Sequence, residues 1–276
     1  MTEPVRITDP SDSRIEVFRA VRDRDVRGRT GLFIAEGVTV LNVLARSGAN
    51  RARSVLVSER KLAGLGLLLS NLTDAEVYVA PQEVLDQIAG FHIHRGVLAC
   101  GERLAEPQPA EILSATASGA MVLVLFGISN HDNMGGLFRS AAAFGAAGVL
   151  LDHTCCDPLY RKAIRVSVGA ALIVPFARLA EGEDALTLLE AHRFTPIALS
   201  PAGRTPLHRL ARPDRTALLL GAEGPGLPEA ILARAHTVSI PMAGGFDSLN
   251  VATAGSIALH HLSFAGAALA GDDEGV

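Results

Sequence analysis

The segment Met121–Ile128 (MVLVLFGI) is apolar at nearly every position, and this pattern limits the folds open to the chain. A strand that is apolar on both faces must be covered on both, which is typical of a central strand in a parallel sheet. Further strand candidates follow, with helical patterns between most of them. They are Val149–Leu151, Ile173–Phe176, Thr195–Leu199, Thr216–Leu220 and Thr237–Ile240. This alternation predicts an α/β fold with a parallel sheet covered by helices on both faces.

A smaller α/β domain is predicted before this region. Its expected strands are Ser54–Ser58, Ala75–Ala80 and Gly96–Cys100, and its expected helices are Val38–Arg46, Lys61–Ser70 and Pro81–Ala89. Residues 102–119 are rich in Pro, Ala, Ser and Thr, a composition that indicates a linker. We therefore expect an N-terminal domain at 1–105, a linker at 106–119 and a C-terminal domain at 120–276.

The composition is that of a globular protein. Hydrophobic residues make up 49% of the 276 residues and charged residues 20%. No stretch reaches the roughly 18 apolar residues that a membrane-spanning helix needs, so we expect no membrane segment. The N-terminus has no apolar signal region, and the three cysteines form no CxxC pair. From these features we expect a cytoplasmic protein with reduced thiols.

The net charge of −4 argues against a wholly basic nucleic-acid binder, but it permits a local basic surface. Residues 14–29 contain six arginines against three acids. That excess fits either a solvated helix with mixed ion pairs or a phosphate-binding surface. For the second reading the candidates are Arg22, Arg24, Arg27 and Arg29. His92 and His94 form an HxH pair without a third ligand nearby, which favours ordinary histidines over a metal site, and we expect no metal.

Two motifs follow buried strands. Asn133–Arg139 (NMGGLFR) comes after Met121–Ile128 and opens a helix, where Asn133 can serve as the cap and the glycines permit close approach. The alternative to a functional site is a capped helix that carries a surface arginine. Leu218–Leu227 (LLLGAEGPGL) ends a buried strand in a turn with three glycines and one carboxylate. The carboxyl edge of a parallel sheet is where ligands bind, so a functional turn is favoured here.

A third motif is Ile240–Ala252 (IPMAGGFDSLNVA), in which a strand leads through a Gly-Gly loop into a helix. The ordinary reading is a strand-to-helix turn capped by Asp247 or Ser248. A buried Asn250 in this apolar turn would be hard to explain by packing alone. The chain lacks GxxxxGK[ST], HExxH and GxSxG, and no GxGxxG follows its first strand, which argues against P-loop and ordinary dinucleotide-binding sites.

Taken together and in this order, the three motifs resemble the NxGxxxR, GxExxG and IPM…SLNV segments of the SpoU-type RNA ribose 2′-O-methyltransferases of the SPOUT class. Arg165–Ala171 (RVSVGAA) resembles a further element of that family. The resemblance covers residues 121 to about 266. The N-terminal part is more loosely similar to the family's RNA-binding domain, through Phe33–Gly37 (FIAEG) and His94–Ala99 (HRGVLA). One departure is Asp132, where the family often has proline.

The resemblance implies an α/β protein with a C-terminal knotted parallel-sheet SPOUT methyltransferase domain and a smaller N-terminal α/β RNA-binding domain. It also implies a homodimer and S-adenosylmethionine as the cofactor. The catalytic candidates that it assigns are Asn133, Arg139, Glu223, Ser248 and Asn250. The cofactor-binding candidates are Leu199, Ser200, Gly221, Ala222, Gly226, Ile240, Met242 and Leu249.

The expected reaction is methyl transfer to the ribose 2′-hydroxyl of one nucleotide, in ribosomal RNA as the first choice and transfer RNA as the second. Arg139 could act as a base or as a phosphate clamp; a guanidinium is a poor base, which favours the clamp. The alternatives are a non-catalytic RNA- or ribosome-binding relative and, more weakly, a small-molecule methyltransferase. Leu259, on the last helix, is expected at the dimer contact or else against its own sheet.

Overall fold

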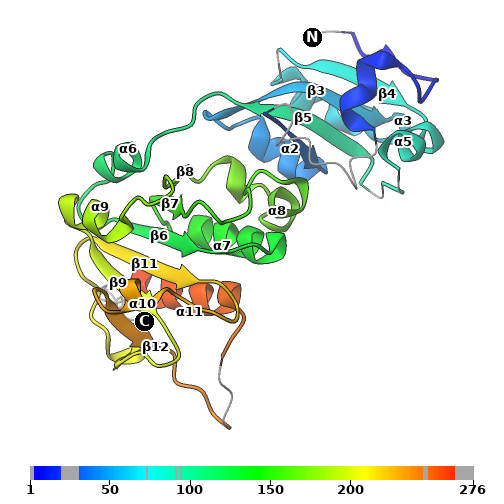
Figure 1. Cartoon of the computed structure of the whole chain (residues 1–276). Coiled ribbons are helices and arrows are strands. Elements are labelled where there is room, and N and C mark those ends of the chain that lie inside the picture. The colour runs from blue at the N-terminus through cyan, green and yellow to red at the C-terminus, as the bar shows by residue number, and fades with distance from the viewer. Residues whose placement is uncertain are drawn as a thin grey trace, which may run out of the picture. The chain divides into compact units, whose positions relative to one another are not determined.

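The computed structural model describes residues 3–19, 31–72, 74–90, 92–93, 95–244 and 248–264. Within them the chain divides into two compact units, which are treated separately (Figure 1). The first unit comprises the described chain up to Glu106 together with residues 130–139 and 156–174. The second comprises residues 107–129, 140–155 and the described chain from Pro175 onward. The predicted domain boundaries stay a prediction, and two later segments contribute to the first unit.

A five-stranded mixed sheet forms the centre of the first unit. In spatial order its strands are β1 (Val5–Arg6), β4 (Glu76–Ala80), β3 (Asn50–Ser58), β5 (Val97–Arg103) and β2 (Leu32–Glu36). The pairs β1–β4 and β3–β4 are parallel, whereas β5 is antiparallel to both β3 and β2. The helices are η1 (Ser13–Phe18), α2 (Val38–Leu44), α3 (Glu59–Leu62), η2 (Ala63–Leu65), α4 (Gly66–Ser70) and α5 (Gln82–Ala89). Apolar side chains of η1, α5 and the strands form one core.

Two short helices from later in the chain complete the first unit. They are α8 (Arg161–Val166) and η3 (Ala170–Leu172). Helix α8 contacts β2, and Arg161 Nη1 donates to Glu36 Oε2 at 2.6 Å. The buried amide of Asn50 donates to the carbonyl oxygen of Leu172 at 2.8 Å. These contacts hold the later segment against the N-terminal sheet.

The second unit contains a seven-stranded sheet in which every described strand pair is parallel. In spatial order its strands are β10 (Thr205–Pro206), β12 (His236–Ser239), β9 (Thr195–Leu199), β11 (Thr216–Gly221), β6 (Met121–Phe126), β7 (Gly148–Leu151) and β8 (Phe176–Arg178). The helices are α6 (Pro109–Ser114), α9 (Ala185–Ala191), η4 (Leu207–Arg209), α10 (Glu229–Leu232) and α11 (Val251–Phe264). Helix α7 (His131–Ala143) begins in the first unit and ends in the second.

Helices cover this sheet, which explains why its central strands are apolar throughout. Side chains of α6, α9 and α10 pack with alternate strand residues in one core. Helix α11 contacts β11 and is drawn in orange beside it in Figure 1. The hydroxyls of Ser140, near the end of α7, and Ser256, in α11, lie 2.6 Å apart. The prediction of a parallel α/β sheet is therefore confirmed.

The predicted strands and helices agree with the structure except in a few segments. The expected helix Lys61–Ser70 is divided among α3, η2 and α4. The expected strand Ile173–Phe176 is wrong, because η3 occupies residues 170–172 and β8 begins only at Phe176. A short apolar run does not distinguish a strand from a buried turn by its periodicity. Strand Leu32–Glu36 was not expected as a strand.

Helix α6 lies inside the segment predicted as a linker. Gln108 and Glu111 form a capping box at its start, and Ile112 and Leu113 are buried in the core of the second unit. At its end the Arg215 guanidinium donates to the Leu113 carbonyl oxygen at 3.0 Å. Burial of one apolar face outweighs the loop-like composition of this segment.

Among the described residues, no helix combines the length and the apolar character that crossing a membrane would require.

Candidate functional site

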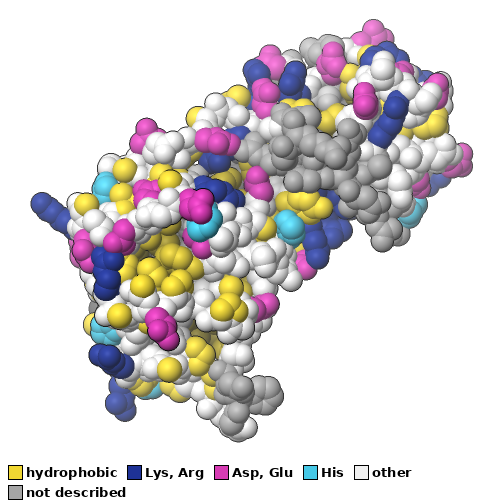
Figure 2. Space-filling model, in the orientation of Figure 1, with side chains coloured by type: hydrophobic (Ala, Val, Ile, Leu, Met, Phe, Trp, Pro, Cys, Tyr) yellow, Lys and Arg dark blue, Asp and Glu magenta, His cyan; other side chains and the backbone are white. Residues whose placement is uncertain are grey.

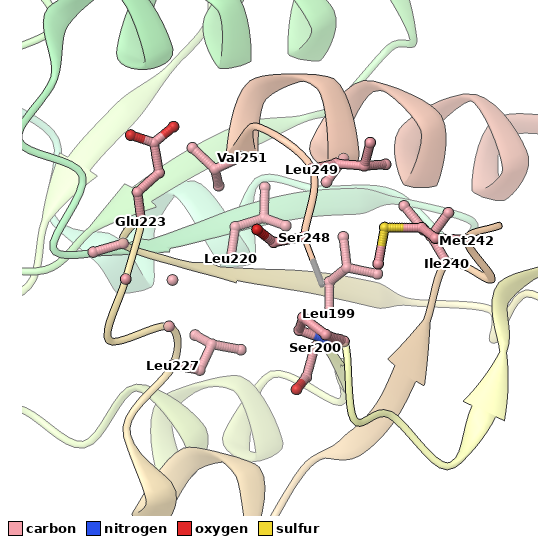
Figure 3. Close-up of a pocket in the computed structure, with 16 residues that line it drawn as sticks. Leu199, Ser200, Leu220, Glu223, Leu227, Ile240, Met242, Ser248, Leu249 and Val251 are labelled. Atoms are coloured by element: carbon pink, nitrogen blue, oxygen red, sulfur yellow. The ribbon is translucent and has the colours of Figure 1, made fainter. Parts of the chain in front are cut away.

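A pocket of about 460 Å³ lies at the carboxyl ends of the neighbouring strands β12, β9 and β11 in the second unit. In the view of Figure 3, Glu223 and Val251 lie at one end, Ile240 and Met242 at the other, and Ser248 between them. The pocket is lined by Leu199, Ser200, Pro201, Leu220, Gly221, Ala222, Glu223, Gly224, Gly226, Leu227, Ile240, Met242, Ser248, Leu249, Val251 and Ala254. Its size falls within the range of pockets that bind small molecules and cofactors.

The turn after β11 owes its shape to glycine. The Gly226 amide donates to the Ala222 carbonyl oxygen at 3.0 Å, which folds the loop back over the end of the strand. A Cβ atom on Gly221 would lie 2.2 Å from the carbonyl carbon of Gly226. Gly224 takes a φ of +90°, a conformation that side-chain-bearing residues rarely adopt. The glycines thus bring backbone amides and carbonyls to the pocket surface, where a ligand can reach them.

Asn250 connects the start of α11 to the carboxylate of this turn. Its Oδ1 accepts hydrogen bonds from the amides of Ala252 and Thr253 at 3.0 and 3.2 Å, as a helix cap does. Its Nδ2 donates to Glu223 Oε1 at 2.9 Å. Asn250 is exposed, so the case of a buried amide in this turn does not arise. The same amide caps the helix and orients Glu223.

Every residue predicted to bind the cofactor lines this one pocket, as do the catalytic candidates Glu223 and Ser248. Their functional roles stay predictions. Further lining residues were not predicted as site residues: Pro201, Leu220, Gly224, Leu227, Val251 and Ala254. A signal for two of them was present: Val251 and Ala254 are three residues apart at the start of a helix and therefore share a face.

The remaining catalytic candidates belong to α7 in the first unit. Asn133 was expected to cap this helix, but the cap is Asn130, whose Oδ1 accepts from the amide of Asp132 at 2.8 Å. The helix begins at His131, so Asn133 already lies in its first turn, where it is buried. Arg139 is exposed two turns further on. A Cβ atom on Gly135 would lie 2.7 Å from Val166 Cβ, so α7 and α8 pack closely there.

Several expectations fall on residues outside the described ranges. They are those for Arg22, Arg24, Arg27, Arg29, His94 and Asp247. His92, the described member of the HxH pair, has its Nδ1 2.5 Å from Asp86 Oδ2. Among the described residues, no group of three or more His, Cys, Asp or Glu side chains is arranged to hold a metal ion.

The donor set of the pocket fits S-adenosylmethionine. The side chains of Leu199, Ile240 and Leu249 offer apolar contact to an adenine ring. The glycine turn offers backbone donors and acceptors at close range, and Glu223 supplies a negative charge that suits the ammonium or sulfonium group of the cofactor.

Residues 120–260 match the model of the SpoU rRNA Methylase family. An uncharacterised tRNA/rRNA methyltransferase of Mycobacterium bovis is 39% identical, over 94% of this chain and 92% of that protein.

The chain is also similar in fold to solved structures. The SpoU methyltransferase AviRb from Streptomyces viridochromogenes, in complex with its cofactor AdoMet, is 25% identical with a TM-score of 0.79, covering 91% of this chain and 98% of AviRb. An RNA 2′-O ribose methyltransferase is 26% identical with a TM-score of 0.74, covering 94% of this chain and 98% of that one.

Proposed function

Because this chain belongs to the SpoU rRNA methylase family, whose members use S-adenosylmethionine to methylate RNA, we propose that it methylates the 2′-hydroxyl of a ribose in RNA. The observation that carries the proposal is the pocket at β9, β11 and β12, where the Glu223–Asn250 pair lies at the rim. The similarity to an RNA 2′-O ribose methyltransferase supports the ribose oxygen as the acceptor.

S-Adenosylmethionine, when bound, supplies a methyl group that is already activated by the sulfonium. The chain's own residues then have to position the ribose hydroxyl and assist the loss of its proton. We assign the backbone of the glycine turn, with Leu199, Ile240 and Leu249, to holding the cofactor. Glu223, fixed by Asn250, orients the reacting groups from the rim, and Ser248 lines the same pocket.

We assign Arg139 to the RNA. Its side chain is exposed, and a guanidinium stays protonated in proteins, so it is suited to clamp the phosphate beside the target ribose rather than to remove a proton. A clamped phosphate holds the 2′-hydroxyl in line for attack. Asn133, buried in the first turn of α7, is the positioning residue for this helix.

Homodimerisation is part of the proposal, as is the knotted threading of the C-terminal segment. Ile257 on α11 is 40% exposed and Phe264 is 59% exposed, although both are large apolar residues. Leu259 is fully buried within the unit and cannot report on a dimer. The Ile257→Glu variant should sediment as a folded monomer with little activity, whereas Leu259→Glu should unfold. A fully active Ile257→Glu monomer would contradict a site that depends on the dimer.

Ribosomal RNA remains the first proposed target and transfer RNA the second. We also propose the cytoplasm as the compartment, since the three cysteines are free thiols. Mapping of 2′-O-methyl positions in RNA from a deletion strain tests the target directly. Loss of a methyl group from one ribosomal nucleotide supports the first choice, and loss from a transfer RNA supports the second.

The competing proposal is a non-catalytic RNA- or ribosome-binding relative. Calorimetric titration with S-adenosylmethionine, followed by transfer of labelled methyl to total RNA, separates the two. Arg139→Ala should abolish transfer while cofactor affinity stays within a few-fold, because Arg139 is not among the residues that line the pocket. Full turnover by Arg139→Ala would overturn its assignment, and cofactor binding without transfer by the natural chain would favour the non-catalytic relative.

A further inference from the structure

We propose that Asp152, the residue after β7, is a positioning residue for the candidate site: through the backbone of Gly127 it fixes the turn that carries Glu223. The inference rests on the proposed function, which gives Glu223 the task of orienting the reacting groups. All three residues belong to the second unit. Asp152 lies outside both the sequence motifs and the pocket lining.

Strand β6 is the middle one of three strands that end together at the carboxyl edge of the sheet, with β11 on one side and β7 on the other. The pairing of β6 with β11 ends at Phe126 and Gly221, and the pairing with β7 ends one residue earlier on β6. Gly127, Ala222 and Asp152 are the first residues beyond the three strands. They are therefore close together at this edge, although the sequence separates them widely.

Asp152 holds the end of β6 from the side of β7. Its amide donates to the Leu125 carbonyl oxygen at 2.9 Å, and its carboxylate accepts from the Gly127 amide. Its Oδ1 also accepts from the amides of Thr154 and Cys155, at 3.0 and 2.9 Å. Burial by itself would raise the pKa of this carboxyl, but the donated hydrogen bonds lower the pKa below its ordinary value, so the group stays ionised. An ionised carboxylate is a strong acceptor for a backbone amide.

The loop that begins at Asp152 is itself anchored. The buried Cys155 Sγ donates to the Leu125 carbonyl oxygen and accepts from the Ile128 amide, each at 3.3 Å. The guanidinium of Arg178, on β8, donates to the carbonyl oxygens of Asp152 and Cys155, each at 2.8 Å. Because the loop is anchored on both sides, its carboxylate can hold the end of β6 in one position.

On its other side, Gly127 meets the turn of the pocket. Gly127 has a φ of +68°, and a Cβ atom on it would lie 3.2 Å from Ala222 Cβ. The Ala222 methyl group therefore faces bare backbone. Ala222 lines the pocket and is followed by Glu223, whose carboxylate accepts from Asn250. The turn is thus fixed at two points, by Asn250 at the carboxylate and by Asp152, through Gly127, at the backbone.

Charge alone does not single out Asp152, because acidic side chains are spread among basic ones on the face shown in Figure 2. Asp184, in the same unit, makes a similar turn. Its Oδ1 accepts from the amides of Leu186 and Thr187 at 3.0 and 3.2 Å, and its Oδ2 accepts from the Thr187 hydroxyl. That turn caps α9, and Asp184 is not part of the pocket lining. Asp184 is therefore the matched control for Asp152.

The test is a double-variant cycle on the full chain, with S-adenosylmethionine affinity measured by calorimetry. Asp152→Ala and Ala222→Gly should each weaken binding about tenfold, because each removes one part of the same connection. The double variant should bind no more than about twofold more weakly than either single variant, whereas independent effects would multiply to about a hundredfold. Asp184→Ala should keep the affinity within about twofold of that of the natural chain.

Urea titration separates positioning from a general loss of stability. Asp152→Ala and Asp184→Ala should both lower the urea midpoint, but only Asp152→Ala should lose cofactor affinity. If the alanine variant does not fold, Asp152→Ser, which keeps one acceptor, takes its place in the cycle. A size exchange tests the same contact without changing Asp152. Gly127→Ala should weaken cofactor binding, and Gly127→Ala/Ala222→Gly should recover most of that loss, because the methyl group is moved across the contact.

Effects that multiply in the cycle, or an unchanged affinity in Asp152→Ala, would overturn the positioning role. Methyl transfer to total RNA is measured on the same variants at saturating S-adenosylmethionine, where Asp152→Ala should slow it about tenfold. If the natural chain transfers no methyl group but the cycle shows coupling, the proposed function fails and the fixing of the turn stands. If transfer occurs and the effects multiply, the function stands and the positioning role fails.

Discussion

The tripeptide Ala-Glu-Gly ends β2 in the first unit, at Ala35–Gly37, and follows β11 in the second, at Ala222–Gly224. In both places the glycine has a positive φ, +93° at Gly37 and +90° at Gly224. The glutamates nevertheless differ. Glu36 is buried against Arg161, whereas Glu223 is exposed at the pocket and accepts a hydrogen bond from Asn250. The local sequence sets the turn, and distant residues decide what the carboxylate does.

A third copy, Ala180–Gly182, supports this reading. Gly182 also has a positive φ, +80°, but Glu181 is exposed and is not part of the pocket lining. One tripeptide therefore occurs in a buried ion pair, in an ordinary exposed turn and at the candidate cofactor pocket. Glu181 gives a natural control for substitutions that affect either of the other two glutamates.

The largest expected effect comes from breaking the buried pair. Arg161→Met leaves the Glu36 carboxylate buried without its partner, and should lower the free energy of unfolding by about 3 kcal/mol in urea titrations. Arg234→Met breaks a pair in the second unit whose side chains are 42% and 45% exposed, and should lower the free energy of unfolding much less, because solvent screens an exposed pair. The double variant Arg161→Met/Glu36→Leu should recover much of the loss. Equal losses in the two single variants would remove the distinction between the buried and the exposed pair.

The next effect concerns the turn that carries Glu223. Gly221→Ala places a Cβ atom where the backbone of Gly226 lies, so the turn must move. Calorimetry should show at least a tenfold loss of S-adenosylmethionine affinity. The free energy of unfolding should fall by about 1–3 kcal/mol. Gly48→Ala is the control in the first unit, because a Cβ atom there meets nothing within 4 Å. Undiminished cofactor affinity in Gly221→Ala would place the cofactor elsewhere.

A smaller effect on stability, but a clear one on activity, is expected at Asn250. Asn250→Asp keeps an oxygen that can cap α11, since Asp and Asn are equivalent caps, so the unfolding free energy should change by less than about 0.5 kcal/mol. It replaces the donor to Glu223 with a second carboxylate, and methyl transfer should fall at least about tenfold. Glu181→Gln should leave both quantities unchanged. Full activity in Asn250→Asp would show that Glu223 needs no orienting donor.

The smallest effect is expected without any substitution, in the rates at which the cysteine thiols of the two units are alkylated. Burial raises the pKa of the Cys100 thiol in the first unit to about 11, and burial, with the Asp152 carboxylate nearby, raises that of Cys155 in the second to about 12. At pH 8 almost no thiolate forms at either residue in the native state, so alkylation requires local opening. Cys156, which is partly exposed, should react with iodoacetamide first, as peptide mass spectrometry can show. Fast labelling of Cys100 alone would show that the first unit opens more readily.

The carboxyl edge of the seven-stranded sheet could be predicted because its signals are local. Apolar runs such as Thr216–Leu220 identify buried strands, and the glycines that follow them identify turns. Parallel strands end at one edge, so predicting the strands also brought their turns together. The helix caps were harder. Asn130 and Asn250 cap α7 and α11, yet the residues favoured for that role were Asn133 and, at the later helix, Ser248 or Asp247.

The first unit was less predictable because its contacts join distant segments. Nothing near Glu36 in the sequence indicates that residue 161 will neutralise it, and nothing near Asn50 points to the carbonyl of Leu172. Helix α6, which belongs to the second unit, was not predicted for the same reason. Its composition resembles that of a loop, and its stability comes from the distant residue Arg215 and from the burial of its apolar face.

The sequence by itself determined where most strands of the seven-stranded sheet, the glycine turns and the three motifs lie, since apolar periodicity and backbone conformation depend on residues a few positions apart. The tertiary structure alone decided that Glu36 becomes buried, that Glu223 remains at an open rim, and that Asn250 serves both the helix and the carboxylate. The physical reason is that desolvation and pairing of a charge depend on which distant groups fold against it. No local pattern encodes those groups.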